Sequence, residues 1–220
     1  GAFTDRFLQA FENDEGLCRF FHVPLQSGSS RILEAMGRDY SLKDFTEAMD
    51  RTRKRLPDAT LATDLIIGFP GETEEDFQES MRRVEEIGFA KVHLFPYSPR
   101  PRTRAARLPD HVSPEVRHDR MVRAREFCER VQLQVAEKRL GQIAHVLIEK
   151  TDPDGGGEGM SREGLRVRVC EGEAVRGQEI PLLLESVEGD KFLRHACDLV
   201  GCTPASRYAL QPGGHPAGSR

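Results

Sequence analysis

The stretch that most constrains the fold is a buried strand that runs through a glycine turn into the start of a helix. Residues 60–67 are apolar and β-branched, and they stop at Gly68 and Gly71, which tolerate backbone angles that other residues avoid. Thr73 then provides an N-cap, with Asp76 three positions later. Ligands of parallel α/β sheets lie at the carboxyl ends of strands. The stretch therefore predicts either a ligand-binding turn or a tight connection with no further role.

The same arrangement occurs on both sides of this unit. An expected strand over residues 19–24 leads into a polar turn over residues 25–30. Another strand, over residues 91–96, leads into a loop whose prolines exclude both a helix and a central strand. Amphipathic helices are expected over residues 4–13, 31–37, 42–56, 74–87 and 114–140. Three strand–turn–helix units in series predict an α/β fold with a parallel sheet or part of a barrel.

Three parallel strands cannot close a barrel by themselves. The first strand would leave an unpaired edge and apolar surface exposed. Since the first residue is Gly rather than Met, we expect the chain to be a piece of a longer protein. In isolation it should be marginally stable or prone to aggregate.

A different pattern begins at Gly141, where helical periodicity gives way to short β-prone runs. These runs cover residues 143–149, 165–170, 180–187 and 191–196, and turns at residues 152–157 and 188–190 separate them. Short strands at this spacing predict a small β-barrel or sandwich. The last residues are rich in Pro, Gly, Ser and Arg without periodicity. We therefore divide the chain into an α/β part (residues 1–140), a small β-barrel (141–198) and a disordered tail (199–220).

Charge and hydropathy exclude some classes of protein. The net charge of −4 does not indicate a nucleic-acid binder. However, one loop carries four arginines in eight residues, namely Arg100, Arg102, Arg104 and Arg107. Such a loop can bind phosphates or be no more than a solvated charged surface. No apolar run approaches the length of a membrane span and the first residues do not resemble a signal peptide, so a cytoplasmic location is expected.

The chain contains no self-sufficient catalytic constellation. Its five cysteines are scattered and offer no pair at the spacing of metal ligands, so we interpret them as free thiols. For the isolated histidines His22 and His93, a role in strand packing is favoured over metal ligation. Four polar side chains next to the strand ends are better suited to hold a ligand than to attack one: Ser27, Ser29, Glu72 and Ser98.

Three motifs, in order, carry a specific resemblance to a known family. They are HVPLQSGS with Ile32, Leu33 and Met36, then TDLIIGFPGET over residues 63–73, then FPYSPR over residues 95–100 with Thr103, Ala105 and Ala106. This set resembles the later half of the radical S-adenosylmethionine (SAM) methylthiotransferases. The strands after Gly141 are similar to the small TRAM β-barrel that follows that core and is associated with tRNA binding. The resemblance covers residues 5–198.

This resemblance implies the fold, the cofactors and the site. It implies the C-terminal part of a radical-SAM partial (β/α) barrel followed by a small OB-like barrel. Gln26, Ser27 and Ser29 would lie near the methionine and ribose of SAM, and Asp64, Ile66 and Gly68 would flank its adenosine. Tyr97 and Arg100 would contact the substrate. No catalytic residue and no metal ligand is assigned within the chain.

The resemblance also implies the reaction and the partners. The family adds a methylthio group to an unreactive ring carbon, using a reduced [4Fe-4S] cluster and SAM, and here the partner would be tRNA. Residues 36–40 and 93–100 look most similar to the branch that modifies C2 of N6-threonylcarbamoyladenosine next to the anticodon. The alternatives are an isopentenyl-adenosine or ribosomal-protein methylthiotransferase, or a non-catalytic RNA-binding module. The oligomeric state stays open.

Two departures from the family pattern bear on these expectations. The cluster-binding CxxxCxxC motif is absent, so the clusters are expected on a preceding part of the protein, and this chain alone is expected to be inactive. Arg102 stands where the family usually has glycine, so the loop is not certain to have the family's conformation. The barrel segment also carries eleven acidic against seven basic residues between positions 149 and 194, which argues against strong RNA binding by the barrel alone.

Overall fold

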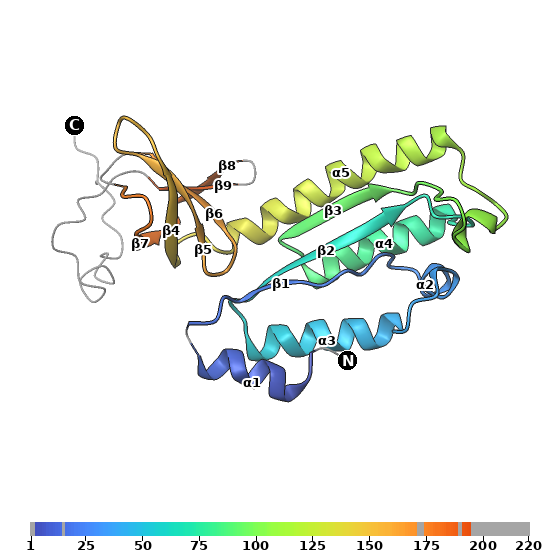
Figure 1. Ribbon diagram of the computed structural model, residues 1–220, viewed down its shortest axis with the longest axis horizontal. Helices are drawn as coiled ribbons and strands as arrows, with labels where there is room; N and C mark the ends of the chain where they lie inside the picture. Colours follow the sequence, from blue (N-terminus) through green and yellow to red (C-terminus); the bar gives the residue numbers. More distant parts are fainter. Residues whose placement is uncertain (1–2, 15, 171–173, 189–190, 195–220) are drawn as a thin grey trace, which may run out of the picture.

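The computed structural model describes residues 3–14, 16–170, 174–188 and 191–194, which form two sheets joined by a long helix (Figure 1). The first sheet has three parallel strands in the order β1 (Phe20–His22), β2 (Thr60–Ile67) and β3 (Lys91–Pro96). This confirms the predicted α/β class with a parallel sheet. Among the described strands the sheet is open, as expected for part of a barrel.

Five α-helices surround or follow the first sheet within the described residues. They are α1 (Asp5–Asn13), α2 (Ser30–Met36), α3 (Leu42–Arg55), α4 (Glu74–Ile87) and α5 (Pro114–Glu137), with a short 3-10 helix η1 at Ala105–Arg107. Capping boxes at Ser41 and Thr73 begin α3 and α4, as the sequence predicted. Gly88 ends α4 in the left-handed region with φ of 68°. No helix among the described residues is both long enough and apolar enough to span a bilayer.

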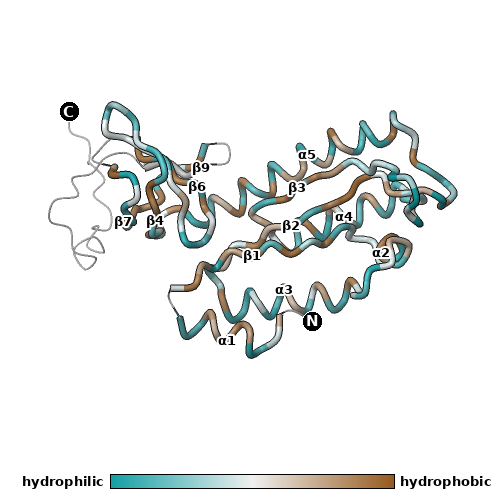
Figure 2. Tube along the Cα trace, viewed as in Figure 1, coloured by the Kyte–Doolittle hydropathy of each residue, from teal (hydrophilic) through white to brown (hydrophobic). Residues whose placement is uncertain are grey.

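One face of the parallel sheet is covered by helices and the other is open. Leu61, Leu65 and Ile67 of β2 are buried in one core together with residues of α3, α4 and α5. The predominance of apolar residues along β2 is visible in Figure 2. Because side chains alternate along a strand, the intervening positions Asp64 and Ile66 point to the opposite face, where they are only half-buried.

The second sheet has six strands in the order β7-β4-β5-β6-β9-β8. Their bounds are β4 (Ile143–Thr151), β5 (Gly157–Ser161), β6 (Arg166–Val169), β7 (Glu179–Leu183), β8 (Ser186–Glu188) and β9 (Lys191–Arg194). This sheet has a hydrophobic core of its own, which includes Val146, Ile148 and Val167. The outermost strands β7 and β8 are not paired with each other among the described residues, so hydrogen bonds do not close the predicted barrel.

The sequence prediction was wrong about two details of this sheet. Strand β5 was missed because its glycines indicated a turn, whereas Gly159 is needed for close strand packing. A Cβ atom at Gly159 would lie 2.2 Å from the carbonyl oxygen of Leu147 on β4. The expected single strand over residues 180–187 is two strands, β7 and β8. The expected tail over residues 199–220 lies outside the described residues, and the domain boundaries stay a prediction.

The two sheets contact each other beside β1. The ring of Phe20 lies against Gly164, where an added Cβ atom would be 2.4 Å from the ring. At the far end of α5, the guanidinium of Arg139 donates a 2.6 Å hydrogen bond to the carbonyl oxygen of Asp58, just before β2. These contacts connect the second sheet to the amino-terminal end of the parallel sheet. The carboxyl-terminal edge, where a ligand would bind, stays clear of the second sheet (Figure 1).

Candidate functional site

The carboxyl ends of the three parallel strands place three turns along one edge of the sheet (Figure 1). The turn after β1 covers residues 23–29, the turn after β2 covers residues 68–73, and the loop after β3 covers residues 97–104. All eight residues expected to contact cofactor or substrate lie in or next to these turns. The structure thus gathers the expected site residues at one edge. Some of their side chains are bonded within the protein, whereas others stay open.

Gln26 extends the pairing of β1 with β2 in a strained backbone conformation. Its φ angle is 67°, a region that disfavours residues with a Cβ atom. The amide of Gln26 donates to the carbonyl oxygen of Asp64 at 2.8 Å, and its own carbonyl accepts from Ile66 at 2.9 Å. Its side-chain oxygen accepts from Arg38 at 2.8 Å. The buried Gln26 side chain is therefore engaged within the protein.

Ser27 and Ser29 hold the first turn against helix α4. The hydroxyl of Ser29 donates a 2.6 Å hydrogen bond to Asp76. Ser27, Ser29 and Asp76 are all buried. Gly28 packs so closely that a Cβ atom there would lie 2.4 Å from the Cα atom of Ser80, whose hydroxyl accepts from the Gly28 amide. In the structure these two serine side chains contact protein, although the sequence indicated a ligand.

Asp76 receives hydrogen bonds from both turns. Burial raises the pKa of Asp76, but hydrogen bonds from Ser29, the Thr73 amide, Arg31 and the Thr73 hydroxyl outweigh it, so the pKa is lowered. The carboxylate therefore stays charged at neutral pH. It joins the turn after β1 to the turn after β2 through one buried acceptor.

Glu72 and Arg120 form the most buried ion pair described in the chain. Their side chains are 2% and 6% exposed, and the Arg120 guanidinium donates to the Glu72 carboxylate at 2.9 Å and to the Glu72 carbonyl at 3.0 Å. The same carboxylate oxygen accepts from the Gly68 amide at 3.0 Å. Glu72 thus closes the Gly-Phe-Pro-Gly turn onto α5. The expectation that its carboxylate would hold a ligand was wrong, because its polar groups face the protein interior.

The groups left open at this edge lie on β2 and in the loop after β3. Asp64 and Ile66 are half-buried on the open face, and Gly68 follows them with φ of 77°. Tyr97 is buried with its ring edge against Phe69, at 5.3 Å between ring centroids. Its hydroxyl finds no hydrogen-bond partner among the described residues. A buried hydroxyl without a hydrogen-bond partner is costly, and the Oγ1 atom of Thr60 is in the same situation.

The loop after β3 presents its arginines to solvent. Arg100, Arg102, Arg104 and Arg107 are all exposed, and no ion pair to them is found within the described part of the chain. Arg102 has φ of 70°, so the loop keeps the conformation that glycine would favour. The departure from the family pattern at this position therefore introduces local backbone strain rather than a different loop.

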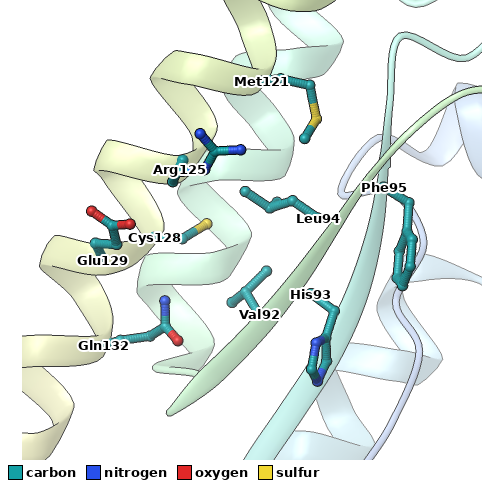
Figure 3. Close-up of a pocket in the computed structure, with 9 residues that line it drawn as sticks. All are labelled: Val92, His93, Leu94, Phe95, Met121, Arg125, Cys128, Glu129 and Gln132. Carbon is teal, nitrogen blue, oxygen red and sulfur yellow. The ribbon is translucent and has the colours of Figure 1, made fainter. Parts of the chain in front are cut away.

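A cavity of about 300 Å³ lies between β3 and α5 (Figure 3). Figure 3 shows Val92 and Leu94 directed toward α5, whereas His93 lies on the other side of the strand. Burial raises the pKa of the Cys128 thiol in this cavity to about 12, so it stays protonated at neutral pH. A protonated thiol neither attacks nor ligates a metal. The thiol of Cys128 therefore gives this cavity no nucleophile, and Arg125 and Glu129 of α5 are the charged side chains in its lining.

The described cysteines do not fit an iron–sulfur cluster. Cys18 is exposed near β1, Cys128 is buried under α5, and Cys170 follows β6. Cys197 and Cys202 lie outside the described residues. A [4Fe-4S] cluster needs thiolates gathered at one point, which these three positions do not provide. The donors of such a cluster are therefore absent from the described site.

Sequence reasoning missed Arg120 and Ser80 as residues that shape the site. A signal for Arg120 was available, since it stands four residues before Ala124, in register with the predicted buried stripe of α5. An arginine at a core-facing helix position needs a buried acidic partner. The same signal was available for Ser80, which stands three residues after Phe77 and four before Val84 on the apolar stripe of α4.

We predict that stability near neutral pH depends on Glu72. Burial raises the pKa of Glu72 from 4.5 to about 7, against the lowering effects of the Gly68 amide and Arg120. A raised folded-state pKa gives stability that is complete below the unfolded value and lost as pH rises through the folded value. Denaturant unfolding of the wild type should therefore show stability falling from pH 4.5 to 7 relative to Glu72→Gln, on the order of a few kcal/mol. A difference that grows in favour of the wild type with rising pH would mean that the charge of Arg120 dominates.

Comparison with known proteins gives one family model and several curated relatives. A model described as the radical SAM superfamily matches residues 2–84. A tRNA-2-methylthio-N(6)-dimethylallyladenosine synthase from Methylacidiphilum infernorum is 34% identical over 98% of this chain and 46% of its own length. Proteins of the same name from Nitratidesulfovibrio vulgaris and Mycobacteroides abscessus are 37% and 41% identical, over 84% and 74% of this chain and 43% and 33% of their own lengths.

Among solved structures, coproporphyrinogen III oxidase from Escherichia coli, a radical SAM enzyme, aligns with a TM-score of 0.47 at 17% identity, covering 76% of this chain and 43% of its own. The chain spans less than half the length of the first two curated relatives named above. The first part of the chain therefore matches the radical SAM model, and over most of its length the chain is similar to proteins named as tRNA-2-methylthio-N(6)-dimethylallyladenosine synthases.

Proposed function

We propose that this chain forms part of a tRNA methylthiotransferase that uses radical SAM chemistry on N6-dimethylallyladenosine. The observation that carries the proposal is the match of almost the whole chain to a synthase of that methylthiolated nucleoside. The gathering of three strand-end turns at one edge of a parallel sheet supports it, because such edges bind ligands. A tRNA substrate and the absence of a membrane-spanning helix among the described residues fit a cytoplasmic enzyme.

The open groups at the sheet edge fit SAM in their chemistry. The half-buried carboxylate of Asp64 suits the hydroxyls of a ribose, and the Ile66 side chain suits the face of an adenine. Gly68 itself is buried, because its amide donates to Glu72 and the Arg117 side chain packs against it. When bound next to a reduced cluster, SAM supplies the radical that activates an otherwise inert carbon. The described chain's part is to hold the nucleoside portion of SAM, with Gln26, Ser27 and Ser29 shaping the turn behind it.

The choice of nucleoside changes from the one that the sequence first suggested. The threonylcarbamoyl branch rested on the resemblance of residues 36–40 and 93–100, but the relatives carry the dimethylallyl nucleoside in their names. Buried Ile32, Phe69 and Tyr97 form an apolar cluster beside the loop after β3. An apolar wall suits the hydrocarbon tail of the dimethylallyl group. Arg100 is exposed, so its guanidinium does not have to contact that tail. The dimethylallyl nucleoside is therefore the better match.

The arginine loop then has a different partner, the phosphate backbone of tRNA. Arg100, Arg102, Arg104 and Arg107 are exposed at the edge where the modified base would enter. Guanidinium groups bind phosphates with a planar fork of donors, and each contact contributes to the salt dependence of binding. The second sheet, with its excess of acidic residues, would then position the RNA more by shape than by charge.

The nucleosides of tRNA from a strain that lacks the complete gene test this function. Mass spectrometry of digested tRNA should show loss of 2-methylthio-N6-dimethylallyladenosine and accumulation of N6-dimethylallyladenosine. Complementation with the wild-type gene should reverse both changes. Loss of the methylthiolated threonylcarbamoyl nucleoside instead would restore the first interpretation. Unchanged nucleosides would indicate a non-catalytic RNA-binding protein.

Tyr97 offers a second test, matched by Tyr40. The Tyr40 hydroxyl donates to the carbonyl oxygens of Pro24 and Leu25 at 3.1 and 3.0 Å, whereas the Tyr97 hydroxyl is unpaired in the described structure. Tyr40→Phe should lower the melting temperature of this chain, corresponding to about 1 kcal/mol, and Tyr97→Phe should not lower it. In the complete enzyme, Tyr97→Phe should nevertheless reduce methylthiolation. A Tyr97→Phe chain as destabilised as Tyr40→Phe, or a fully active enzyme, would argue against a substrate-facing hydroxyl.

A further inference from the structure

Three potential metal ligands meet on the open face of the parallel sheet. His22 lies on β1, Asp64 on β2 and His93 on β3, so each of the three strands contributes one. One ligand atom from each residue lies within 4.8 Å of the other two. Among the described residues this is the group of histidine, cysteine and acidic side chains that comes close enough to hold one ion.

The convergence follows from strand register and side-chain alternation. Asp64 pairs directly with His93, and His22 pairs with Ala62, two residues before Asp64 on the same face of β2. All three side chains therefore point away from the helices. Figure 3 shows His93 on the side of β3 opposite to Val92, Leu94 and α5. The sequence analysis interpreted His22 and His93 as isolated residues with a role in strand packing. It did not anticipate their convergence, because the convergence depends on pairing between segments about 40 and 30 residues apart.

The geometry is that of a nearly assembled site. The Nε2 atom of His22 lies 3.0 Å from Oδ1 of Asp64. The imidazole rings of His22 and His93 stack with centroids 5.5 Å apart and planes 17° from parallel. The contact with Asp64 gives His22 a polar partner, but none is found for the His93 ring among the described residues. A cation bound by one ring nitrogen of each histidine and one oxygen of the carboxylate would give all three side chains a partner.

The donor set selects a class of metal ion. Two imidazoles and one carboxylate suit zinc and neighbouring transition metals, whereas magnesium and calcium prefer oxygen ligands alone. The side chains of His22 and Asp64 are 36% and 23% exposed, so an ion from solvent can reach them. Three protein ligands leave a coordination position for water or another small ligand.

We propose that His22, Asp64 and His93 bind one divalent transition-metal ion, such as Zn²⁺, on the open face of the parallel sheet. This site is separate from any iron–sulfur cluster, since it contains no cysteine. It shares Asp64 with the expected adenosine contacts, and Ile66 lies two residues further along the same face of β2. The inference does not depend on the proposed function, since neither SAM nor tRNA is needed for the ion to bind.

The test is metal titration of the 220-residue chain after treatment with a chelator. Co²⁺ serves as a visible probe, followed by competition with Zn²⁺, and the variants are His93→Ala and Asp64→Asn. His118→Ala is the matched control, because His118 is an exposed histidine on α5 outside the cluster. Circular dichroism establishes that each variant keeps the wild-type fold.

The wild type and His118→Ala should bind one equivalent with equal affinity and a cobalt spectrum of nitrogen and oxygen ligands. His93→Ala and Asp64→Asn should bind the ion at least about tenfold more weakly. Loss of a residue that only orients a metal ligand already lowers metal affinity by about tenfold, and these variants change ligands themselves. The proposal is overturned if the folded wild type binds neither ion. It is also overturned if His93→Ala binds as tightly as the control, or if a sulfur-to-cobalt charge-transfer band shows that cysteines are the ligands.

Discussion

The carboxyl-terminal edge of the parallel sheet depends on one buried ion pair, between Glu72 and Arg120. The pair joins two elements, because Glu72 closes the turn after β2 and Arg120 projects from the first third of α5. Through the Gly68 amide the same carboxylate fixes where β2 ends. Removing Glu72 would leave the Arg120 guanidinium buried without this acceptor, which typically costs about 3–5 kcal/mol. The position of α5 and the shape of the ligand-binding edge are therefore coupled.

The residues that build this edge of the sheet differ from the residues that are free to contact a ligand there. The polar side chains of Glu72, Asp76 and the two serines of the first turn are consumed by contacts within the protein. What stays available is the open face of β2 and the unpaired hydroxyl of Tyr97. Turns held by buried hydrogen bonds keep those open groups in place without contacting a ligand themselves, which is how a preorganised site is built.

Local patterns in the sequence predicted the elements of the first sheet closely, because caps, strand ends and glycine turns act over a few residues. Strand β2 and helix α4 have the predicted bounds. Strand β5 was missed because the close approach of Gly159 to Leu147 exists only after the strands pair. The role of Glu72 was likewise hidden, because its partner Arg120 is 48 residues away. The sequence could place the site at the strand ends, but it could not tell which polar groups face inward.

Amide hydrogen exchange at Gly68 tests the central claim most directly. If Arg120 holds Glu72 and Glu72 holds the turn, then Arg120→Met should accelerate exchange of the Gly68 amide as Glu72→Ala does, because both release the same acceptor. The adjacent strand amide of Ile66, which donates to the Gln26 carbonyl, should keep its protection in both variants. Exchange at Gly68 that stays at the wild-type rate in Arg120→Met would contradict the account, since the turn would then hold its shape without α5.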